Sequence, residues 1–196
     1  KVTIKVKMET IGSLSASIQK EMTRHYGMTL IPVSKKDRML ALTEIETGIG
    51  IKTEAKTLNT FDKTIRKVDM WRIPKPSKIY DIFEKTGKEA NKLFNYDISE
   101  IGDIQYLEYR VGDYYNIHSD VDNGTASKRK ISMSWVLDSK YDGGDFKIYA
   151  HGEGMTVNIT PSNILAFTSW HEHSVSIVTE GVRRCLVCWY IGEQWR

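Results

Sequence analysis

The sequence predicts a mainly β fold of the α+β class: a double-sheet jelly roll or small barrel, with N-terminal helices packed on one outer face. Residues 98–196 contain eight short β-rich runs separated by turn residues, with no helical pattern between them. A strongly helical pattern precedes them at 78–94. The 196 residues are 40% hydrophobic, which suffices for one good core. We therefore expect a single domain over 1–196, with 1–97 as a supporting region of helices and strands and 98–196 as the β core.

The first part of the chain shows mixed patterns. Apolar and polar residues alternate over 2–8, as in a half-buried strand, and apolar residues recur four apart over 14–22, which indicates a short helix. Residues 39–45 and 67–73 are strand-like, and a turn is expected between them at the Gly48-Ile49-Gly50 sequence.

A helix is predicted over 78–94. Pro74 and Pro76 interrupt the preceding chain, and Ser77 stands where an N-cap belongs. Gly87 lies inside the pattern and weakens it without abolishing it. The apolar residues that recur at near-helical spacing are Ile79, Ile82, Phe83, Ala90, Leu93 and Phe94.

The β-rich part is divided by glycine, proline and asparagine turns. We expect strands near 104–110, 113–119, 130–137, 145–149, 155–159, 164–167, 174–178 and 183–191.

Composition excludes some classes of function. The net charge of +3 comes from scattered lysines interspersed with acids, and no basic stripe with aromatics favours a nucleic-acid partner. No apolar run reaches the length of a membrane span or a secretory signal, so we expect no membrane partner and a cytoplasmic location. The chain begins with Lys1, so a trimmed targeting segment would escape this expectation. Oligomeric state has no signal in the sequence.

The two cysteines, Cys185 and Cys188, have the C-x-x-C spacing of zinc and redox sites. Their surroundings are those of a strand, in which residues three apart face opposite sides. We therefore interpret both as structural.

The candidate site begins with His118 and Asp120. In a strand, alternate residues share a face, so an imidazole and a carboxylate can meet at one point. Two ligands hold a catalytic metal poorly, and a third must come from the remaining histidines. His25 is far from the β-rich part and His151 lies in an expected turn, which leaves His171 and His173 as alternatives that chemistry alone does not separate.

An arginine is expected in the same interior. If residues 179–181 form a three-residue hairpin loop with Gly181 in the left-handed region, residue 177 lies opposite 183 and residue 173 opposite 187. With His173 facing inward, Arg183 then faces inward too, roughly 13 Å away along the strands. Cys185, Val187 and Trp189 would share this face, and Cys188 would face outward.

Two histidines and one aspartate leave three positions of an octahedral ion free, the arrangement associated with non-haem Fe(II) oxygenases. Mn, Co, Ni and Zn would also accept these ligands. The inward arginine favours iron with a 2-oxo acid, which can chelate the metal at one end while its far carboxylate pairs with Arg183.

At these residues the sequence resembles the 2-oxoglutarate and Fe(II)-dependent dioxygenases, and within them the prolyl 4-hydroxylase branch. The resemblance spans about residues 106–191 and implies a double-stranded β-helix (jelly roll) core. The motifs that carry it are Tyr109-x-x-Gly112-x-x-Tyr115-x-x-His118-x-Asp120, Arg129-x-x-Ser132 followed by Leu137 and Asp142-Gly143-Gly144-Asp145, and His173-x-Val175-x-x-Val178-Thr179-x-Gly181-x-Arg183 ending near Trp189.

The resemblance implies roles for individual residues. The family places the distal metal histidine ten residues before the basic residue that binds the tail of 2-oxoglutarate, which selects His173 over His171 and assigns the tail to Arg183. It also implies that Tyr109 hydrogen-bonds the same carboxylate and that Ser132 lies near the cosubstrate. The cofactors implied are Fe(II), 2-oxoglutarate and O2, with ascorbate in support.

Some features depart from the family and concern the substrate. Many prolyl 4-hydroxylases carry Lys at the tail-binding position, where this chain has Arg183, Ile177 replaces a frequent proline, and the stretch before Pro74 has no match. Demethylases of alkylated nucleic acids share the iron ligands but carry a further arginine near the end of the core, for which Arg196 is a poor candidate, so this class is not favoured. We expect hydroxylation of a C–H bond, first of a prolyl residue in a peptide or protein, coupled to decarboxylation of 2-oxoglutarate to succinate and CO2. The loop 121–127 is expected to act as a lid.

Three alternatives remain open from the sequence. The chain could hydroxylate a free amino acid or small metabolite, or be a metal-dependent enzyme that does not use 2-oxoglutarate. It could also be a non-catalytic jelly-roll binding module in which His118 and His173 are merely buried.

Overall fold

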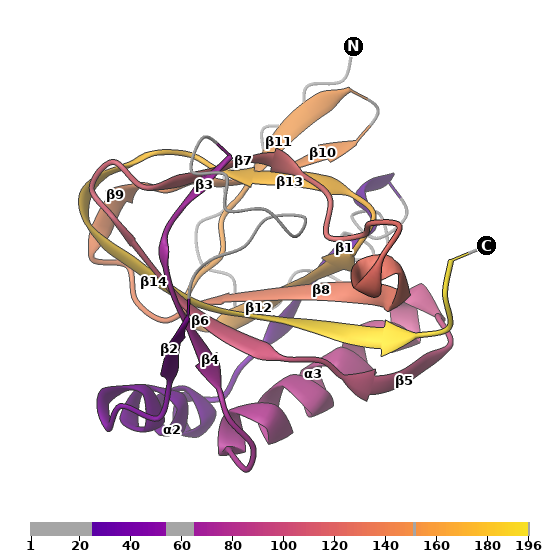
Figure 1. Ribbon diagram of the computed structural model, residues 1–196, viewed down its shortest axis with the longest axis horizontal. Coiled ribbons are helices and arrows are strands. Elements are labelled where there is room, and N and C mark those ends of the chain that lie inside the picture. The colour runs from indigo at the N-terminus through magenta and orange to yellow at the C-terminus, as the bar shows by residue number, and fades with distance from the viewer. Residues whose placement is uncertain (1–24, 54–64, 151, 196) are drawn as a thin grey trace.

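Two antiparallel β-sheets face each other, and two helices cover the outer face of the larger sheet, as the computed structural model shows (Figure 1). The structure describes residues 25–53, 65–150 and 152–195. The elements of the first part are β1 (Met28–Pro32), α2 (Lys35–Glu46), β2 (Ile51–Thr53), β3 (Arg66–Lys67), β4 (Asp69–Ile73), α3 (Lys78–Phe94) and β5 (Ile98–Ile101). Those of the second part are β6 (Ile104–Arg110), β7 (Tyr114–His118), η1 (Thr125–Lys128), β8 (Arg129–Val136), β9 (Tyr141–Gly143), β10 (Phe146–Ala150), β11 (Glu153–Val157), β12 (Asn163–Thr168), β13 (Glu172–Val175) and β14 (Val178–Gly192).

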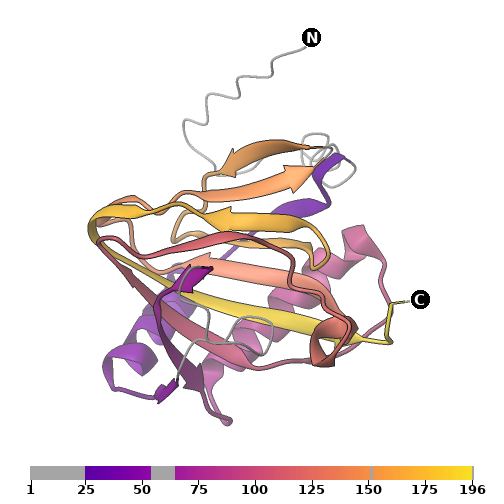
Figure 2. The ribbon, with the colours of Figure 1, turned by 45° about the horizontal axis from the view of Figure 1, so that its top comes forward.

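The larger sheet runs in the order β1-β12-β8-β14-β6-β4-β2, with β5 and β9 each paired to β14. The smaller sheet runs β11-β10-β13-β7-β3 and lies across the larger one, as the tilted view shows (Figure 2). The predicted mainly β jelly-roll architecture is confirmed. Strands from the first part of the chain extend both sheets, because β1, β2 and β4 join the larger and β3 joins the smaller.

Helix α3 matches the predicted range, and its start has a simple cause. The Ser77 hydroxyl accepts a hydrogen bond from the Ile79 amide at 3.0 Å, which satisfies one of the free amides of the first turn. The glycine inside the helix also has a packing reason: a Cβ on Gly87 would lie 2.3 Å from the Tyr190 ring. The helix therefore approaches β14 closely at this point.

One prediction for the first part is wrong. Residues 39–45, expected as a strand, lie in α2. The Ser34 side chain caps this helix by accepting from the Asp37 amide at 3.0 Å. Only Ala41 of α2 is buried, so the apolar periodicity that identifies a helix is weak in this stretch.

The turn expected at 48–50 is present, and the strand expected at 67–73 appears as β3 and β4. The strand and helix expected at 2–8 and 14–22 lie outside the described residues. In the part that the structure describes, no helix is long and apolar enough to cross a membrane.

The core is divided by the larger sheet. Between that sheet and the helices lies one apolar cluster, centred on Phe83, Trp135 and Leu186. Between the two sheets lies a second cluster, with Phe146, Phe167 and Tyr109 among its members. The candidate site opens into this second layer.

Candidate active site

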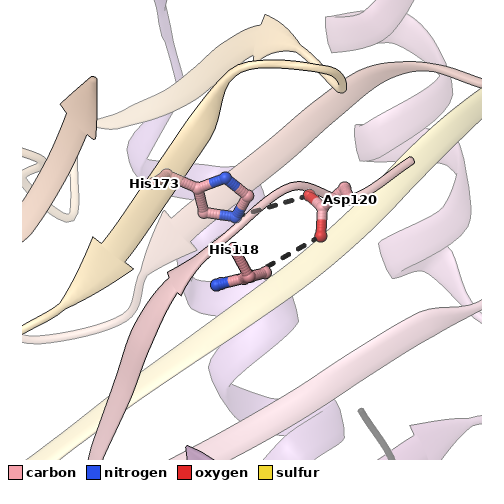
Figure 3. Close-up of side chains that lie close together, drawn as sticks. All are labelled: His118, Asp120 and His173. Carbon is pink, nitrogen blue, oxygen red and sulfur yellow. Dashed lines mark ion pairs between the residues drawn. The ribbon is translucent and has the colours of Figure 1, made fainter. Parts of the chain in front are cut away.

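Strand register brings two histidines together. His118, at the end of β7, lies directly opposite His173 in the neighbouring strand β13, and their ring centroids are 4.1 Å apart. Asp120 follows two residues after His118, where a hydrogen bond from its own amide to the Ser169 carbonyl fixes the chain at 3.1 Å. Its carboxylate faces both imidazoles (Figure 3).

The three side chains offer a compact set of ligand atoms. The Asp120 carboxylate lies 3.8 Å from His118 Nε2 and 3.5 Å from His173 Nε2. One ligand atom from each residue lies within 4.8 Å of the other two, and the three side chains are 7–11% exposed. This spacing is compatible with one ion bound at the centre.

Backbone carbonyls set the tautomer of both histidines. His118 Nδ1 lies 2.8 Å from the Asn116 carbonyl, and His173 Nδ1 lies 3.0 Å from the His171 carbonyl. Because a carbonyl oxygen can only accept, each Nδ1 carries the proton and each Nε2 presents its lone pair toward Asp120. Both imidazoles are thereby oriented as metal ligands.

The electrostatics favour the protonation states that a cation needs. Burial lowers the pKa of His118 to about 3, and the neighbouring His173 acts in the same direction, so His118 is neutral near pH 7. Burial alone would raise the pKa of Asp120, but His173, His118 and Arg129 together with a hydrogen bond from Ser132 place it below its usual value. The site thus holds a neutral His118 imidazole beside an ionised Asp120 carboxylate.

Two serines and an arginine position Asp120. The Ser132 hydroxyl donates to the carboxylate at 2.6 Å and lies 3.0 Å from the Ser169 hydroxyl. Arg129 donates to the Asp120 carbonyl at 3.2 Å, and its guanidinium lies 3.8 Å from the centroid of the Trp189 ring. The sequence placed Ser132 near the cosubstrate, whereas its hydroxyl contacts the candidate metal ligand.

Arg183 enters the same space from β14 in the larger sheet. Its side chain is 1% exposed, with one nitrogen 3.0 Å from Cys185 Sγ and the guanidinium 5.4 Å from the centroid of the Tyr109 ring. Arg183 Nε has no hydrogen-bond partner, and no carboxylate of the described residues lies within the 4.0 Å of an ion pair. Gly144 leaves room for it, since a Cβ there would lie 2.8 Å from Arg183 Cδ.

The register predicted between His173 and Arg183 is wrong. No hairpin joins 173–178 to 182–187, because β13 belongs to the smaller sheet and β14 crosses into the larger one. Val187 lies opposite Gln105 and Ser134 instead of His173. Arg183 and His173 nevertheless line the same space because the two sheets face each other.

The candidate ligands and Arg183 line a single cavity of about 690 Å³, a size typical of small-molecule sites. Tyr109, Ser132 and Trp189 also line it. Sequence reasoning missed Arg66, which lines the cavity from the two-residue strand β3. Its only sequence signal was an arginine in a strand-like stretch of mixed pattern.

His171 lies apart from this cavity. It is absent from the cavity wall, stacks on Trp170 at 4.0 Å between ring centroids, and faces Gly27, where a Cβ would lie 2.7 Å from its Nε2. His25 is exposed as expected, and His151 lies outside the described residues.

The two cysteines, the loop 121–127 and Arg196 were also considered from the sequence. Cys185 and Cys188 are free and buried, and they belong to different core clusters, so the C-x-x-C is no ligand pair. The loop 121–127 borders the cavity through Asp122, whose carboxylate accepts from the Gly124 and Ala126 amides at 2.8 and 3.0 Å. Arg196 lies outside the described residues.

The donor set fits a divalent cation that prefers nitrogen and oxygen ligands. Two imidazoles and one carboxylate form the three-ligand set of non-haem Fe(II) oxygenases, which leaves positions for other ligands. The unpaired, buried guanidinium of Arg183 fits a carboxylate in the same cavity, because a buried charge without a counterion is costly.

Comparisons with known proteins agree with this geometry. Residues 104–191 match the family model of the 2OG-Fe(II) oxygenase superfamily. A PKHD-type hydroxylase from Synechococcus sp. (strain CC9311) is 33% identical over 79 residues, covering 38% of this chain and 35% of that protein. The chain therefore spans about a third of the length of this curated relative.

Solved structures share the fold. A Pseudomonas putida prolyl-4-hydroxylase matches with a TM-score of 0.71 at 16% identity, covering 90% of this chain and 98% of that chain. A Trichoplax adhaerens prolyl hydroxylase, in complex with a hypoxia inducible factor oxygen degradation domain peptide fragment, gives 0.71 at 16% identity, covering 90% and 88%. HygX from Streptomyces hygroscopicus, with nickel, 2-oxoglutarate and hygromycin B bound, gives 0.67 at 13% identity, covering 93% and 90%.

Proposed function

We propose that the chain is a hydroxylase of the 2OG-Fe(II) oxygenase type, because residues 104–191 match the model of that superfamily. Such an enzyme would require Fe(II), 2-oxoglutarate and O2. Its reaction would couple decarboxylation of 2-oxoglutarate to succinate and CO2 with hydroxylation of a C–H bond. The first candidate substrate is a prolyl residue in a peptide or protein.

One observation carries the proposal: a two-histidine, one-carboxylate cluster shares a cavity with a buried arginine that no described carboxylate pairs. A non-catalytic binding module would have no need to keep Nε of Arg183 buried and without a hydrogen bond. A metal-dependent enzyme without a dicarboxylate cosubstrate would leave the same cation unexplained.

Each residue would have a distinct task. His118, Asp120 and His173 would hold the iron through Nε2, a carboxylate oxygen and Nε2. Arg183 would pair with the far carboxylate of 2-oxoglutarate, with Tyr109 beside it, and Ser132 would orient Asp120 by its hydrogen bond. Bound iron and 2-oxoglutarate would supply the activation of O2, which the side chains of the chain do not provide.

The cavity wall would protect and orient the reaction. Phe146 and Phe167 pack on His173 at 5.5 and 4.8 Å between ring centroids, which helps to hold the imidazole facing Asp120. These two rings would also shield the metal side of the cavity from water. The loop 121–127 stands at the edge of this cavity, where a lid over a peptide would act.

Two comparisons support a prolyl substrate. The similar structures from Pseudomonas putida and Trichoplax adhaerens are prolyl hydroxylases, the second of them in complex with a peptide fragment. The matching relative, a PKHD-type hydroxylase, supports hydroxylation without naming the substrate. A small-molecule substrate is the second candidate, because HygX has a similar fold and contains hygromycin B.

The test is a hydroxylation screen. Protein, Fe(II), ascorbate and 2-oxoglutarate are incubated with a library of proline-containing peptides and free amino acids, while succinate is measured and products are analysed by mass spectrometry. We expect slow succinate formation without substrate, and faster formation with addition of one oxygen atom to a prolyl residue. If no succinate forms and no metal binds after anaerobic reconstitution, the result would favour the non-catalytic binding module.

A further inference from the structure

A second buried arginine lines the cavity from the opposite sheet. Arg66 lies in β3 at the edge of the smaller sheet, opposite Tyr115 of β7, and is 8% exposed. Arg183 belongs to the larger sheet and has its guanidinium 5.4 Å from the centroid of the Tyr109 ring. Both arginines lie close enough to Tyr109 to act on its pKa, each in the lowering direction. The cavity therefore has a cation on each of its two walls.

Arg66 lies close to the candidate metal ligands. Its guanidinium is 4.7 Å from the centroid of the Tyr115 ring, and the same ring stacks on His118 with 3.4 Å between centroids and 12° between planes. Arg66 and His118 thus share one aromatic partner. The positive charge also contributes to the lowered pKa of His118.

Arg66 has no anionic partner in the part of the chain that the structure describes. No carboxylate there lies within 4.0 Å of it, and its Nε is buried without a hydrogen bond. The next residue of β3, Lys67, does have an anionic partner, because its ammonium lies 2.8 Å from the Asp113 carboxylate. Contact with an aromatic ring offsets only a small part of the cost of burying an unpaired charge.

The cosubstrate does not explain this second cation. The far carboxylate of 2-oxoglutarate needs one buried guanidinium, and Arg183 supplies it. A second one lines the same cavity from the other wall, next to the Tyr115–His118 stack, and is available to the molecule to be oxidised.

We propose that Arg66 binds a carboxylate of the primary substrate, so that this site selects anionic substrates. The proposal rests on the proposed function, because it assigns the substrate class of the same site. Two sources of the carboxylate share this chemistry: an acidic side chain next to the target residue of a peptide, or a free acidic amino acid. Arg66 is then a specificity-determining residue, and the cosubstrate requirement is independent of it.

The experiment measures binding without turnover. Protein loaded with Mn(II) and 2-oxoglutarate under nitrogen is titrated with probes that differ only in charge. One arm uses a set of proline hexapeptides that contain glutamate and their glutamine twins, and the other uses free L-glutamate and L-glutamine. In either the peptides or the free amino acids, we expect the acidic probe to bind about tenfold more tightly than its neutral twin. The set of probes that shows this preference identifies whether the substrate carboxylate belongs to a peptide or to a free amino acid.

Substitutions at Arg66 and at Arg110 test whether Arg66 causes the preference for acidic probes. Arg66→Gln should remove the preference for the acidic probe while the 2-oxoglutarate requirement of succinate formation is unchanged, and Arg66→Lys should keep part of the preference. Arg110→Gln is the matched control, because Arg110 is 57% exposed and pairs with Glu108 outside the cavity wall. It should keep the full preference. The wild-type comparison needs no variant, so it stands even where Arg66→Gln does not fold.

Three results would overturn the proposal. The first is equal binding, or no binding, of the acidic and neutral probes by the wild type. The second is a preference for the acidic probe that persists in Arg66→Gln. The third is a raised 2-oxoglutarate requirement in Arg66→Gln, which would make Arg66 a second cosubstrate anchor. Absence of succinate formation by the Fe(II)-loaded wild type would instead sink the proposed function. Normal succinate formation without any charge preference would sink only the role of Arg66.

Discussion

The two faces of β14 differ in what they contact. On the side of helix α3, Leu186, Cys188 and Tyr190 belong to an apolar cluster. On the other side, Arg183 and Trp189 line the cavity with polar atoms that have no hydrogen-bond partner. One strand with alternating side chains therefore supplies both a packed layer and a binding surface.

The distribution of unpaired polar atoms supports this division. Eight buried side-chain atoms of the described residues lack a hydrogen bond, and five of them belong to cavity-lining residues. These five are Thr53 Oγ1, Arg66 Nε, Gln105 Oε1, Arg183 Nε and Trp189 Nε1. Buried polar groups are normally paired, so their concentration around one cavity indicates a site built for polar ligands. Stability should depend on the helix side and ligand binding on the cavity side.

The largest effect is expected at the candidate metal ligands. His173→Ala should lower succinate formation by at least about a thousandfold, because it removes one of only three protein ligands. His171→Ala is the control, since His171 lies off the cavity wall, and it should retain turnover. Turnover assays with metal analysis check this, and loss in His171→Ala with retention in His173→Ala would reverse the assignment.

The next effect tests the helix side. Phe83 is fully buried between α3 and the sheet, where its ring meets Trp135 at 6.3 Å between centroids. Phe83→Ala should lower the free energy of unfolding by about 3–5 kcal/mol, measured by urea denaturation. The 2-oxoglutarate requirement of the folded variant should be unchanged. A large change in that requirement would show that the two faces are coupled.

A smaller effect is expected at the carboxylate anchor. Arg183→Leu leaves the far carboxylate of 2-oxoglutarate unpaired, so the concentration needed for half-maximal succinate formation should rise about tenfold to a hundredfold. Stability should change little, because the arginine has no described anionic partner to lose. An unchanged requirement, measured by titration of 2-oxoglutarate, would remove Arg183 from the cosubstrate site.

The smallest effect concerns pH. His118 has a pKa of about 3 in the folded protein and about 6.5 when unfolded, so only the unfolded state gains a proton between these values. The contribution of His118 to the free energy of unfolding is therefore complete above pH 6.5. It decreases as the pH falls toward 3, by up to about 1.4 kcal/mol per pH unit. Metal-free wild type should therefore lose more stability than His118→Asn between pH 7.5 and 5, in thermal unfolding. Parallel profiles would contradict the burial-driven shift.

Local signals in the sequence identified the parts whose structure depends on neighbours along the chain. The Ser77 cap and the apolar spacing set the bounds of α3, and the alternation over 104–110 matches β6. The type and spacing of neighbouring residues are sufficient to predict these features. The pair of His118 and Asp120 was identified from the two-residue period of a strand, but β7 ends at His118. Asp120 is placed instead by the hydrogen bond from its amide to the Ser169 carbonyl.

Features that depend on distant parts of the chain were missed. The expected hairpin before Arg183 failed because the chain leaves one sheet after β13 and enters the other at β14, a choice set by packing across the molecule. Arg66 was overlooked because a two-residue strand shows no periodicity, and only its pairing with β7 brings it beside His118. The choice between His171 and His173 likewise came from the resemblance to a family.

The most direct test of the central claim is an anaerobic titration of the Fe(II)-loaded wild type with 2-oxoglutarate, followed by visible absorption. We expect one equivalent of 2-oxoglutarate to bind and to produce an absorption change that requires the metal. This change should be lost in His173→Ala and retained in His171→Ala. Binding of Fe(II) without any metal-dependent response to 2-oxoglutarate would contradict the central claim.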